Sequence, residues 1–285
     1  MSSRISIIIP AKNESAGLSL LLPNIKERYP SAEVIVVDDG STDDTAKVCR
    51  THGAQLVSHP YSIGNGAAVK SGVRVAQGEI LVFVDGDAQH DPADIDALLQ
   101  QIEKGYDMAV GARNFSAHSS RTRWFGNSIY NTLASWIVSR EIPDLTSGFR
   151  AVKAKKFREF LYLLPNGFSY PTTITMAFFR AGYTVVYVPI TTKRRAGSSH
   201  IRMMRDGLRF LIIIFRIGTL YSPLKIFLPA SLLFFLLGIG YYMHTYLTQG
   251  RFTNMSALLF IASIVVFLIG LVSEQITSLI YRKDN

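Results

Sequence analysis

A chain of 285 residues is long enough for one sizeable domain plus a further element, and its single cysteine, Cys49, excludes an internal disulfide. Hydrophobic residues make up 48% of the chain, which is high for a soluble protein, and they dominate it after about residue 222. The formal net charge of +9 predicts an anionic partner, for which nucleic acid, phosphorylated lipid and the inner membrane leaflet all qualify.

Apolar strands and helices alternate through the first 113 residues. Strands are predicted in five apolar runs, at 5–9, 33–37, 55–59, 79–87 and 107–113. A helical pattern follows each of the first four, and Asn13 or Ser15 is expected to cap the first helix. Strands without polar alternation indicate a mostly parallel sheet covered by helices on both faces. Ligands bind such sheets beyond the carboxyl ends of the strands, where VVDDGS and VDGD both lie.

The pattern becomes irregular at 113–145. GFRAVKAKKFREFL, which starts at Gly148, predicts another helix, and TVVYVPITTKRR predicts a strand that runs into a basic loop. Residues 202–216 place arginines on one helical face and Leu, Ile and Phe on the other. This arrangement is typical of a helix lying in a membrane surface, although a soluble helix covering a core has the same pattern.

Two apolar segments favour the membrane. Residues 226–246 and 257–273 are each near the roughly 20 residues that cross a bilayer, whereas a buried soluble hairpin of this apolarity is rare. Positive charges flank both spans on the side away from the link, so we expect both termini and the N-terminal domain in the cytosol. No secretory signal is visible at the start. The expected organisation is a cytosolic domain at 1–200, juxtamembrane amphipathic helices at 201–224 and a two-helix anchor at 225–285.

An acidic cluster follows the fourth strand, in VFVDGDAQHDP. Asp85 and Asp87 can aim at one point if the backbone turns between them, and Gly86 is expected to permit that turn. Together with Gln89 they suit Mg²⁺ or Mn²⁺ better than zinc, which prefers His and Cys. His90 is expected to face solvent or to cap the next helix. Taken alone, VVDDGSTDDT and GNGAAVKSG are better explained as turns.

Taken together, the motifs IIIPAKNES, VVDDGSTDDT, GNGAAVKSG, VDGDAQHDP and TSGFRA resemble the inverting nucleotide-sugar glycosyltransferases of family 2, which have the GT-A fold. The likeness covers about residues 5–200. DAQHDP, DLTSGFRA and RRAGSSH, followed by transmembrane helices, look most like the polyprenyl-phosphate hexose synthases of that family. Those include dolichyl-phosphate mannose synthase and undecaprenyl-phosphate glucosyltransferases.

The resemblance implies roles for individual residues. Six residues are implied to contact the nucleotide: Pro10, Asn13, Glu14, Asp38, Asp39 and Asp85. Asp85 would lie near the sugar and ribose, while Asp87 and Gln89 would bind the Mg²⁺ or Mn²⁺ that bridges the diphosphate. Four residues would carry the catalytic step: Asp85, Asp87, Arg123 and Arg194.

The expected acceptor, a polyprenyl phosphate, is already an anion at pH 7, so it needs electrostatic steering more than a general base. Basic residues that could supply this steering are Arg113, Arg121, Arg123, Lys193, Arg194 and Arg195. Some of them are expected to be ordinary surface arginines. The resemblance implies that the acceptor phosphate is bound by Arg113, Arg123, Arg194 and Ser199.

The predicted activity is therefore metal-dependent transfer of one hexose, from GDP-mannose or UDP-glucose, to dolichyl or undecaprenyl phosphate, with inversion to a β-linked product. The expected partners are the nucleotide-sugar, the lipid phosphate, the membrane and further copies of the chain, with no nucleic acid. One alternative is a family 2 enzyme that glycosylates a lipid-linked sugar or a growing polysaccharide; for a hydroxyl acceptor, Asp144 is a conceivable base. In the second case SRTRW would correspond imperfectly to the QxxRW motif. A non-catalytic membrane adaptor is a further alternative, against which the intact acidic cluster argues.

Overall fold

The computed structural model describes residues 4–113, 131–167, 170–191, 215, 218–219 and 221–280. The chain divides into two compact units, one of Met1–Thr132 with Glu141–Asp206 and one of Leu133–Arg140 with Gly207–Asn285. The domain limits predicted at residues 200 and 224 stay predictions. Apart from Phe215, the amphipathic helix predicted at 202–216 lies outside the described residues.

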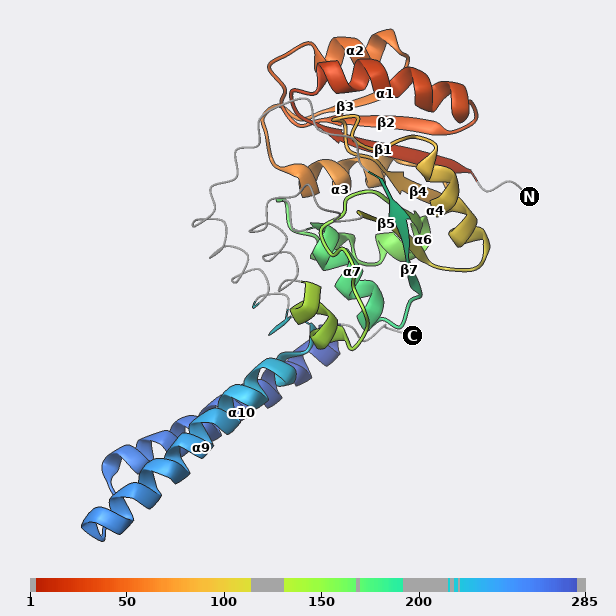
Figure 1. The fold of residues 1–285 in the computed structure, drawn as a ribbon. Helices are drawn as coiled ribbons and strands as arrows, with labels where there is room; N and C mark the ends of the chain where they lie inside the picture. The colour runs from red at the N-terminus through yellow and green to blue at the C-terminus, as the bar shows by residue number, and fades with distance from the viewer. Residues whose placement is uncertain are drawn as a thin grey trace. The chain divides into compact units, whose positions relative to one another are not determined.

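A seven-stranded sheet forms the centre of the first unit, in the order β3-β2-β1-β4-β6-β5-β7 (Figure 1). Its strands are β1 (Ile5–Ala11), β2 (Glu33–Asp38), β3 (Gln55–Ser58), β4 (Ile80–Phe83), β5 (Met108–Arg113), β6 (Arg150–Lys153) and β7 (Val185–Ile190). Every neighbouring pair is parallel except the two that β6 makes with β4 and β5. The predicted mostly parallel α/β sheet is thus confirmed.

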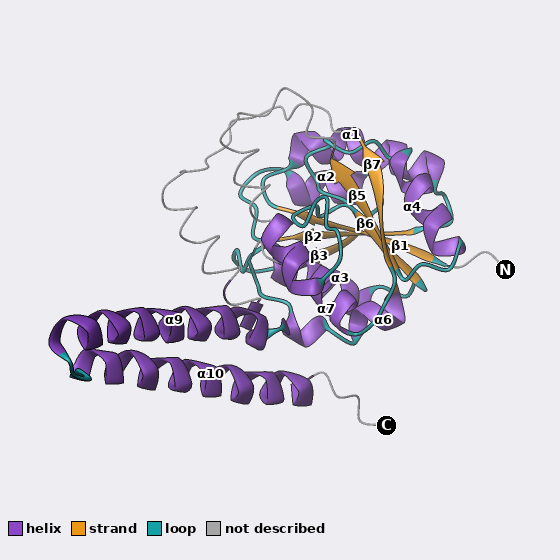
Figure 2. Cartoon of the chain, turned by 60° about the horizontal axis from the view of Figure 1, so that its bottom comes forward, coloured by secondary structure: helices purple, strands orange, loops and turns teal. Residues whose placement is uncertain are grey.

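Helices cover both faces of this sheet (Figure 2). They are α1 (Ser15–Arg28), α2 (Thr45–Thr51), α3 (Asn65–Val75), α4 (Asp94–Glu103), α6 (Ala154–Arg158) and α7 (Tyr170–Arg180), with a short 3-10 helix at Leu161–Leu163. Side chains of α1, α2 and α4 share one core with the sheet. On the opposite face α3 packs on β1, and the ring of Phe83 in β4 meets Phe157 of α6 and Tyr170 of α7.

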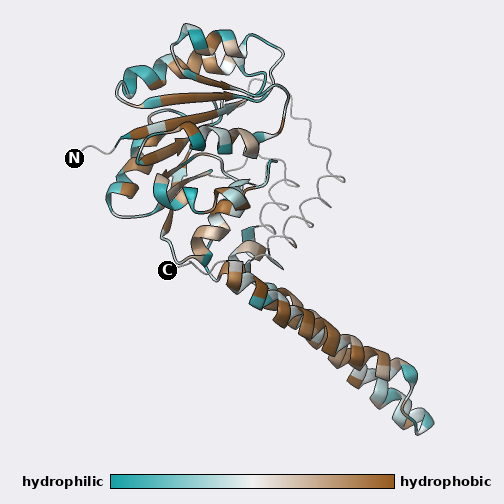
Figure 3. Cartoon of the chain, turned by 180° about the vertical axis from the view of Figure 1, so that it is seen from behind, coloured by the Kyte–Doolittle hydropathy of each residue, from teal (hydrophilic) through white to brown (hydrophobic). Residues whose placement is uncertain are grey.

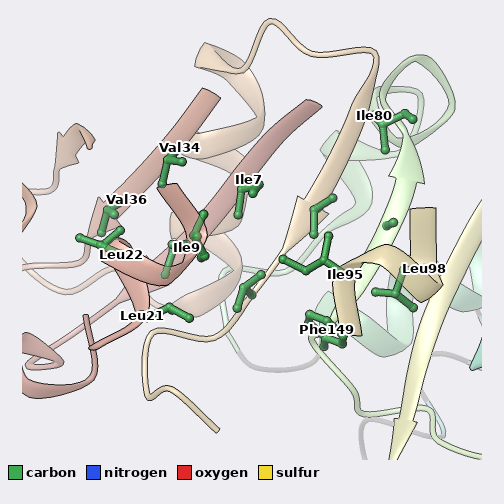
Figure 4. Packing of buried hydrophobic residues seen from close by; sticks show 14 of the residues in the cluster. Ile7, Ile9, Leu21, Leu22, Val34, Val36, Ile80, Ile95, Leu98 and Phe149 are labelled. Carbon is green, nitrogen blue, oxygen red and sulfur yellow. The ribbon is translucent and has the colours of Figure 1, made fainter. Parts of the chain in front are cut away.

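The core explains why the strands are apolar throughout. Successive side chains of β1 point to opposite faces, and both faces are covered, so Ile7, Ile8 and Ile9 are all fully buried. Ile7 and Ile9 pack in the cluster that α1 and α4 complete (Figure 4). Ile8 faces α3, where Gly72 makes room for it: a Cβ there would lie 2.5 Å from Ile8 Cγ2.

Strand β6 departs from the helix predicted from Gly148 onward. All four of its residues pair antiparallel with β4 and three of them also with β5, so that Arg150 lies opposite Phe83 of β4 and Val110 of β5. Only at Ala154 does α6 begin. Periodicity cannot tell whether a short apolar run forms a strand or a helix. Here pairing with β4 and β5 stabilises the strand.

Helix α7 has no counterpart in the sequence analysis. Every residue from Tyr170 to Phe178 is buried, so the helix is buried on every side over this stretch. A helix that is buried on every side need not separate apolar from polar residues, so periodicity is a weak guide to it. The β-branched run Thr172–Ile174 moreover favours a strand by propensity.

The second unit is built on an apolar helical hairpin, α9 (Pro223–Gln249) and α10 (Asn254–Ile280). Each helix has 27 residues, about 40 Å at 1.5 Å per residue, which exceeds the roughly 30 Å hydrocarbon core of a bilayer. Figure 3 shows the apolar residues concentrated along most of its length. Both helices are long and apolar enough to cross a membrane, as the sequence predicts.

Small residues bring the two hairpin helices together. Gly238 faces the Phe260 ring and Gly270 faces Phe227, where a Cβ would lie only 2.7 Å from the phenylalanine Cβ. Between these contacts the Ser263 hydroxyl donates to the carbonyl oxygen of Ser231 at 2.9 Å. Small residues and interhelical hydrogen bonds are the usual means of packing helices in lipid, where hydrophobic association is weak.

Lys225, near the start of α9, holds a separate helical segment, residues 131–138. Its Nζ donates to the carbonyl oxygens of Ile137 at 2.8 Å and Trp136 at 3.2 Å, and to the Ser139 hydroxyl at 2.7 Å. The last carbonyls of a helix lack partners within the helix, and a cation is favoured beside them. This contact is one reason why residues 133–140 group with the hairpin.

Asp39, directly after β2, fastens the loop between β3 and α3 to the sheet. One carboxylate oxygen accepts bonds from His59 Nδ1 at 2.7 Å and the Ile63 amide at 2.9 Å. The other accepts bonds from the Ser62 hydroxyl at 2.7 Å and the Gly64 amide at 2.9 Å. Burial raises the pKa of Asp39, but these hydrogen bonds outweigh burial and lower the pKa to about 2.

Replacing Asp39 with Asn should destabilise the folded protein at neutral pH, and the effect should fade in acid. Because the folded-state pKa lies below the ordinary value, the carboxylate contributes stability above about pH 4 that is lost as the pH falls toward about 2. Thermal unfolding of the detergent-solubilised protein, followed by circular dichroism, should show the gap between wild type and variant narrowing over that range. A gap independent of pH would contradict this assignment.

Candidate active site

The candidate site lies where the chain order of the strands reverses, between β1 and β4. From β1 the chain proceeds to β2 and β3 on one side, and β4 then returns to the other side of β1. Parallel pairing brings the carboxyl ends of these strands to one edge, with Ala11 opposite Asp38 and Ile8 opposite Phe83. Crevices at such reversal points are the usual binding sites of open α/β sheets.

The loop after β1, which follows Pro10, is tied to the loop after β2. Asn13 has a positive φ of 55°, and its side-chain oxygen accepts the Thr42 amide at 2.8 Å. The Glu14 amide donates to the Thr45 hydroxyl, and the Ser15 amide to the Asp43 carboxylate, both at 3.1 Å. The expected cap of α1 by its own Asn13 or Ser15 is therefore wrong, because the next loop supplies the acceptors.

Asp38 and Asp39, both implied to contact the nucleoside, are buried and hydrogen-bonded. Asp38 accepts the Ser41 amide at 2.9 Å. Each carboxylate oxygen of Asp39 accepts two hydrogen bonds from the loop 59–64, so this residue holds that loop in place beside the site. Their contact with a nucleoside stays a prediction, as it does for Pro10, Asn13 and Glu14.

The glycines of GNGAAVKSG leave room for residues 165–167 to pack closely against the start of α3. A Cβ on Gly64 would lie 2.4 Å from the Asn166 carbonyl oxygen, and one on Gly66 would lie 2.1 Å from that of Pro165. The Gly66 and Ala67 amides, in the first turn of α3, donate to carbonyl oxygens of residues 166–167. This helix start is therefore capped by the protein's own carbonyls.

The acidic turn after β4 reverses at a different residue from the one expected. Gly86 lies in the turn but is not among the positive-φ residues, whereas Ala88 has a φ of 55°. The reversal brings the Gln89 amide to the Asp87 carboxylate at 3.2 Å. An alanine in the left-handed region is strained by about 1 kcal/mol or more, and such strain is typical of functional turns.

Gly17 in α1 lets this acidic turn approach the helix. A Cβ at Gly17 would lie 2.3 Å from the Gly86 carbonyl oxygen and 3.0 Å from the Asp87 Cα. Glycine inside a helix costs roughly 1 kcal/mol relative to alanine, so its presence here marks close packing. The first turn of α1 thus packs directly against the backbone of Gly86 and Asp87.

Asp85 is flanked by His90 and by the turn before β6. His90 Nε2 lies 3.6 Å from Asp85 Oδ2, and the imidazole stacks on the Phe149 ring, 4.6 Å between centroids and 8° from parallel. The prediction that His90 faces solvent or caps a helix is wrong, because its side chain is only 6% exposed. The missed signal was the apolar Phe149 in TSGFRA, which is distant in sequence.

Arg113, at the end of β5, forms a bidentate pair with Asp144. Its Nε and Nη2 donate to the two carboxylate oxygens at 2.7 and 3.0 Å, and Nη2 also reaches the Thr146 hydroxyl at 2.7 Å. Burial lowers the pKa of Arg113, but the bonds to Asp144 outweigh it and raise the pKa. Asp144 is about 1% exposed, so it serves better to orient Arg113 than to remove a proton from an acceptor.

Arg150 of the TSGFRA motif is fully buried. Its guanidinium donates to the carbonyl oxygens of Ser147 and Pro171 and to the Thr175 hydroxyl. The structure records no carboxylate in an ion pair with it among the described residues, and burial lowers its pKa. The bond to Ser147 fixes the turn that touches Asp85.

The remaining predicted residues lie outside the described part of the chain. These are Arg123, Arg194 and Ser199, together with the basic residues Arg121, Lys193 and Arg195. Their roles stay predictions. Of the residues predicted to bind the acceptor phosphate, the structure describes Arg113.

The donor set fits a hard divalent cation that keeps positions for substrate. Asp87 and Gln89 offer oxygen ligands on one turn, beside Asp85. Among the described residues no three His, Cys, Asp or Glu side chains gather to hold a metal by themselves. Such a partial oxygen set suits Mg²⁺ or Mn²⁺ shared with phosphate groups better than a closed zinc site.

Two curated relatives cover most of this chain. This chain is 26% identical to "Glycosyltransferase AglJ" of Haloferax volcanii over an alignment 290 residues long, which covers 96% of this chain and 94% of that protein. The "Polyprenol monophosphomannose synthase" of Mycolicibacterium smegmatis is 29% identical over 217 residues, which cover 70% and 81%.

Among solved structures, glucosyl-3-phosphoglycerate synthase of Mycobacterium tuberculosis, in complex with Mn²⁺, UDP and glucosyl-3-phosphoglycerate, superposes with a TM-score of 0.63. The identity is 20%, over 76% of this chain and 80% of that chain. The same enzyme is also known with Mg²⁺ and UDP. At this identity the likeness concerns the fold, and the predicted GT-A architecture is confirmed.

Two family models match separate parts of the sequence. The model of the GtrB C-terminal hairpin matches residues 222–279, which include α9 and nearly all of α10. The model of glycosyl transferase family 2 matches residues 6–161, more than half of the chain, from β1 through β6 and α6. Together with the sheet, the acidic turn and the GT-A likeness, this match establishes that the chain belongs to glycosyl transferase family 2.

Proposed function

We propose that this glycosyltransferase transfers a single hexose from a nucleotide-sugar to a polyprenyl phosphate and produces a β-linked lipid-phosphate sugar. The observation that carries the proposal is the presence, in one chain, of a GT-A site with an acidic turn and an apolar hairpin long enough for a membrane. The relative named as a polyprenol monophosphomannose synthase supports a lipid phosphate as acceptor.

On the donor side, Asp87 and Gln89 would hold Mg²⁺ or Mn²⁺ against the diphosphate, and Asp85 would contact the sugar and ribose. The solved relatives with Mn²⁺ or Mg²⁺ and UDP support this family-level assignment. When bound, the cation neutralises the charge that develops on the departing diphosphate. Pro10, Asn13, Glu14, Asp38 and Asp39 form or brace the wall along which the nucleoside would lie.

On the acceptor side, Arg113 would bind the lipid phosphate, together with the predicted Arg123, Arg194 and Ser199. Asp144 pre-orients the Arg113 guanidinium at 2.7 and 3.0 Å. An acceptor phosphate oxygen attacks the anomeric carbon with its own electron pair while the bond to the diphosphate oxygen breaks and that oxygen keeps the pair. One displacement inverts the configuration, and no proton has to be removed.

The hairpin would anchor the enzyme with two spans, and we propose that the catalytic domain and both termini face the cytosol. Lys225 precedes the spans, Arg282 and Lys283 follow them, and the link between them carries one charge. The positive-inside rule supports this topology. Association of several copies through the spans stays a prediction.

A panel of donors tests the proposed function. Purified protein in bilayers should transfer radiolabelled mannose from GDP-mannose, or glucose from UDP-glucose, to undecaprenyl or dolichyl phosphate. The product should be a chloroform-soluble, β-linked phosphodiester. Transfer only to a lipid-linked sugar or a polysaccharide would overturn the choice of acceptor.

Asp87→Ala should lower turnover by about 10³-fold, because the departing diphosphate loses its counter-charge. The matched control is Asp91→Ala in the same stretch, since Asp91 accepts the Ala93 amide at 3.0 Å just before α4 and should affect stability alone. Turnover is measured in EDTA-treated membranes with Mn²⁺ added back. Full activity of Asp87→Ala without metal would refute the metal assignment.

Arg113→Lys should raise the acceptor KM about tenfold or more, because an ammonium cannot keep the bidentate pair with Asp144 and also bind phosphate. Donor affinity should stay within about twofold of wild type. Arg28→Lys is the control, since Arg28 pairs with Asp96 at an exposed position on α1 and should be silent. An equal loss of donor and acceptor binding would show that Arg113 is misassigned.

A further inference from the structure

We infer that His90 is a positioning residue, which holds one oxygen of the Asp85 carboxylate so that the other is presented to the donor. This inference rests on the proposed function, since it takes Asp85 as the group that meets the sugar and ribose. It adds a second motif to the donor site, because the histidine is itself held by the Phe149 ring of TSGFRA.

The imidazole is immobilised on one side of Asp85. Its ring is stacked nearly parallel on Phe149 and its side chain is 6% exposed, so it has little freedom to turn. The Asp85 side chain, in contrast, is 42% exposed. In this pair the histidine is therefore the fixed member, and the carboxylate is the group that can adjust.

The environment of the ring selects its tautomer. Nδ1 is buried and has no hydrogen-bond partner among the described residues. A buried N–H without an acceptor is costly, whereas an unpaired ring lone pair costs less, so the proton of the neutral ring belongs on Nε2. Nε2–H is the atom that faces Asp85 Oδ2 at 3.6 Å, about half an ångström beyond a hydrogen bond. Such contacts are often long without substrate and shorten when it binds.

Gly148 lies close to both oxygens of the same carboxylate. A Cβ there would lie 3.2 Å from Oδ1 and 3.4 Å from Oδ2 of Asp85, so any larger residue would press on the carboxylate. Arg150 fixes this turn through the Ser147 carbonyl, and the Phe149 carbonyl oxygen accepts the Gly111 amide at 2.9 Å. The turn before β6 thus supports both neighbours of the Asp85 carboxylate, Gly148 directly and His90 through the Phe149 ring.

Two substitutions of His90 separate the effect of losing the hydrogen bond to Asp85 from the effect of losing the imidazole ring. The amide nitrogen of glutamine reaches about as far as Nε2, while that of asparagine reaches only about as far as Nδ1. We expect His90→Gln to keep donor affinity within about threefold, and His90→Asn to weaken it about tenfold, the worth of one hydrogen bond to a charged group. The acceptor KM should not change. His52→Asn, at the end of α2, controls for loss of a histidine elsewhere.

A double-mutant cycle with Asp85→Asn distinguishes positioning from general structural damage. Donor affinity is measured by calorimetry, with UDP-glucose and GDP-mannose in the presence of Mn²⁺, on the full-length protein. If His90 acts through Asp85, His90→Asn should cost about tenfold in wild type and less than about twofold in the Asp85→Asn background. An equal cost in both backgrounds, or equal losses in His90→Gln and His90→Asn, would overturn the inference.

The double-mutant cycle measures the affinity for the nucleotide-sugar and not the transfer reaction. A negative result for His90 is therefore distinct from a negative result for the proposed function. A wild type that binds nucleotide-sugar but does not glycosylate polyprenyl phosphate overturns the acceptor assignment, and the cycle still decides the role of His90. A wild type that binds neither nucleotide-sugar overturns both.

Discussion

The antiparallel insertion of β6 between β4 and β5 is the constraint on which the candidate site depends. An antiparallel strand begins where its parallel neighbours end, so the segment that leads into β6 must arrive at the carboxyl edge of the sheet. That segment delivers Asp144 to Arg113, Gly148 to Asp85 and Phe149 to His90. One strand direction thus connects the acidic turn after β4 with the Arg113–Asp144 pair.

Acidic residues at this edge divide into two physical classes. Asp39 and Asp144 are buried, and several donors occupy their oxygens, so they shape loops and aim an arginine. Asp85 keeps nearly half of its side-chain surface exposed, and Asp87 lies on a strained turn in which φ is positive at Ala88. Carboxylates of the first class stabilise the loops around the site, and those of the second are accessible to a ligand.

Most of the sheet could be predicted from the sequence because continuous apolar runs and helical patterns alternate through the first 113 residues. The interpretation failed where local pattern carries little information. The four-residue strand that begins at Arg150 depends on pairing with distant neighbours, and α7 is buried on every side from Tyr170 to Phe178. The acidic turn was located correctly, but its reversal at Ala88 and its contact with His90 arise from packing against α1 and Phe149. Such packing leaves no trace in residue spacing.

The hydrogen bonds of Lys225 determine which fragments of this protein can be studied separately. Residues 133–140 follow the first part of the sheet-containing unit in sequence, yet their helix ends on the amine of Lys225, which belongs to the apolar hairpin. A soluble fragment cut at residue 200 would keep this helix and lose its cap. Buried Ala134 and Ile137 would then lie in a fragment without the segment they group with. Experiments should therefore use the full-length protein in a bilayer, because a fragment that ends at residue 200 is expected to aggregate.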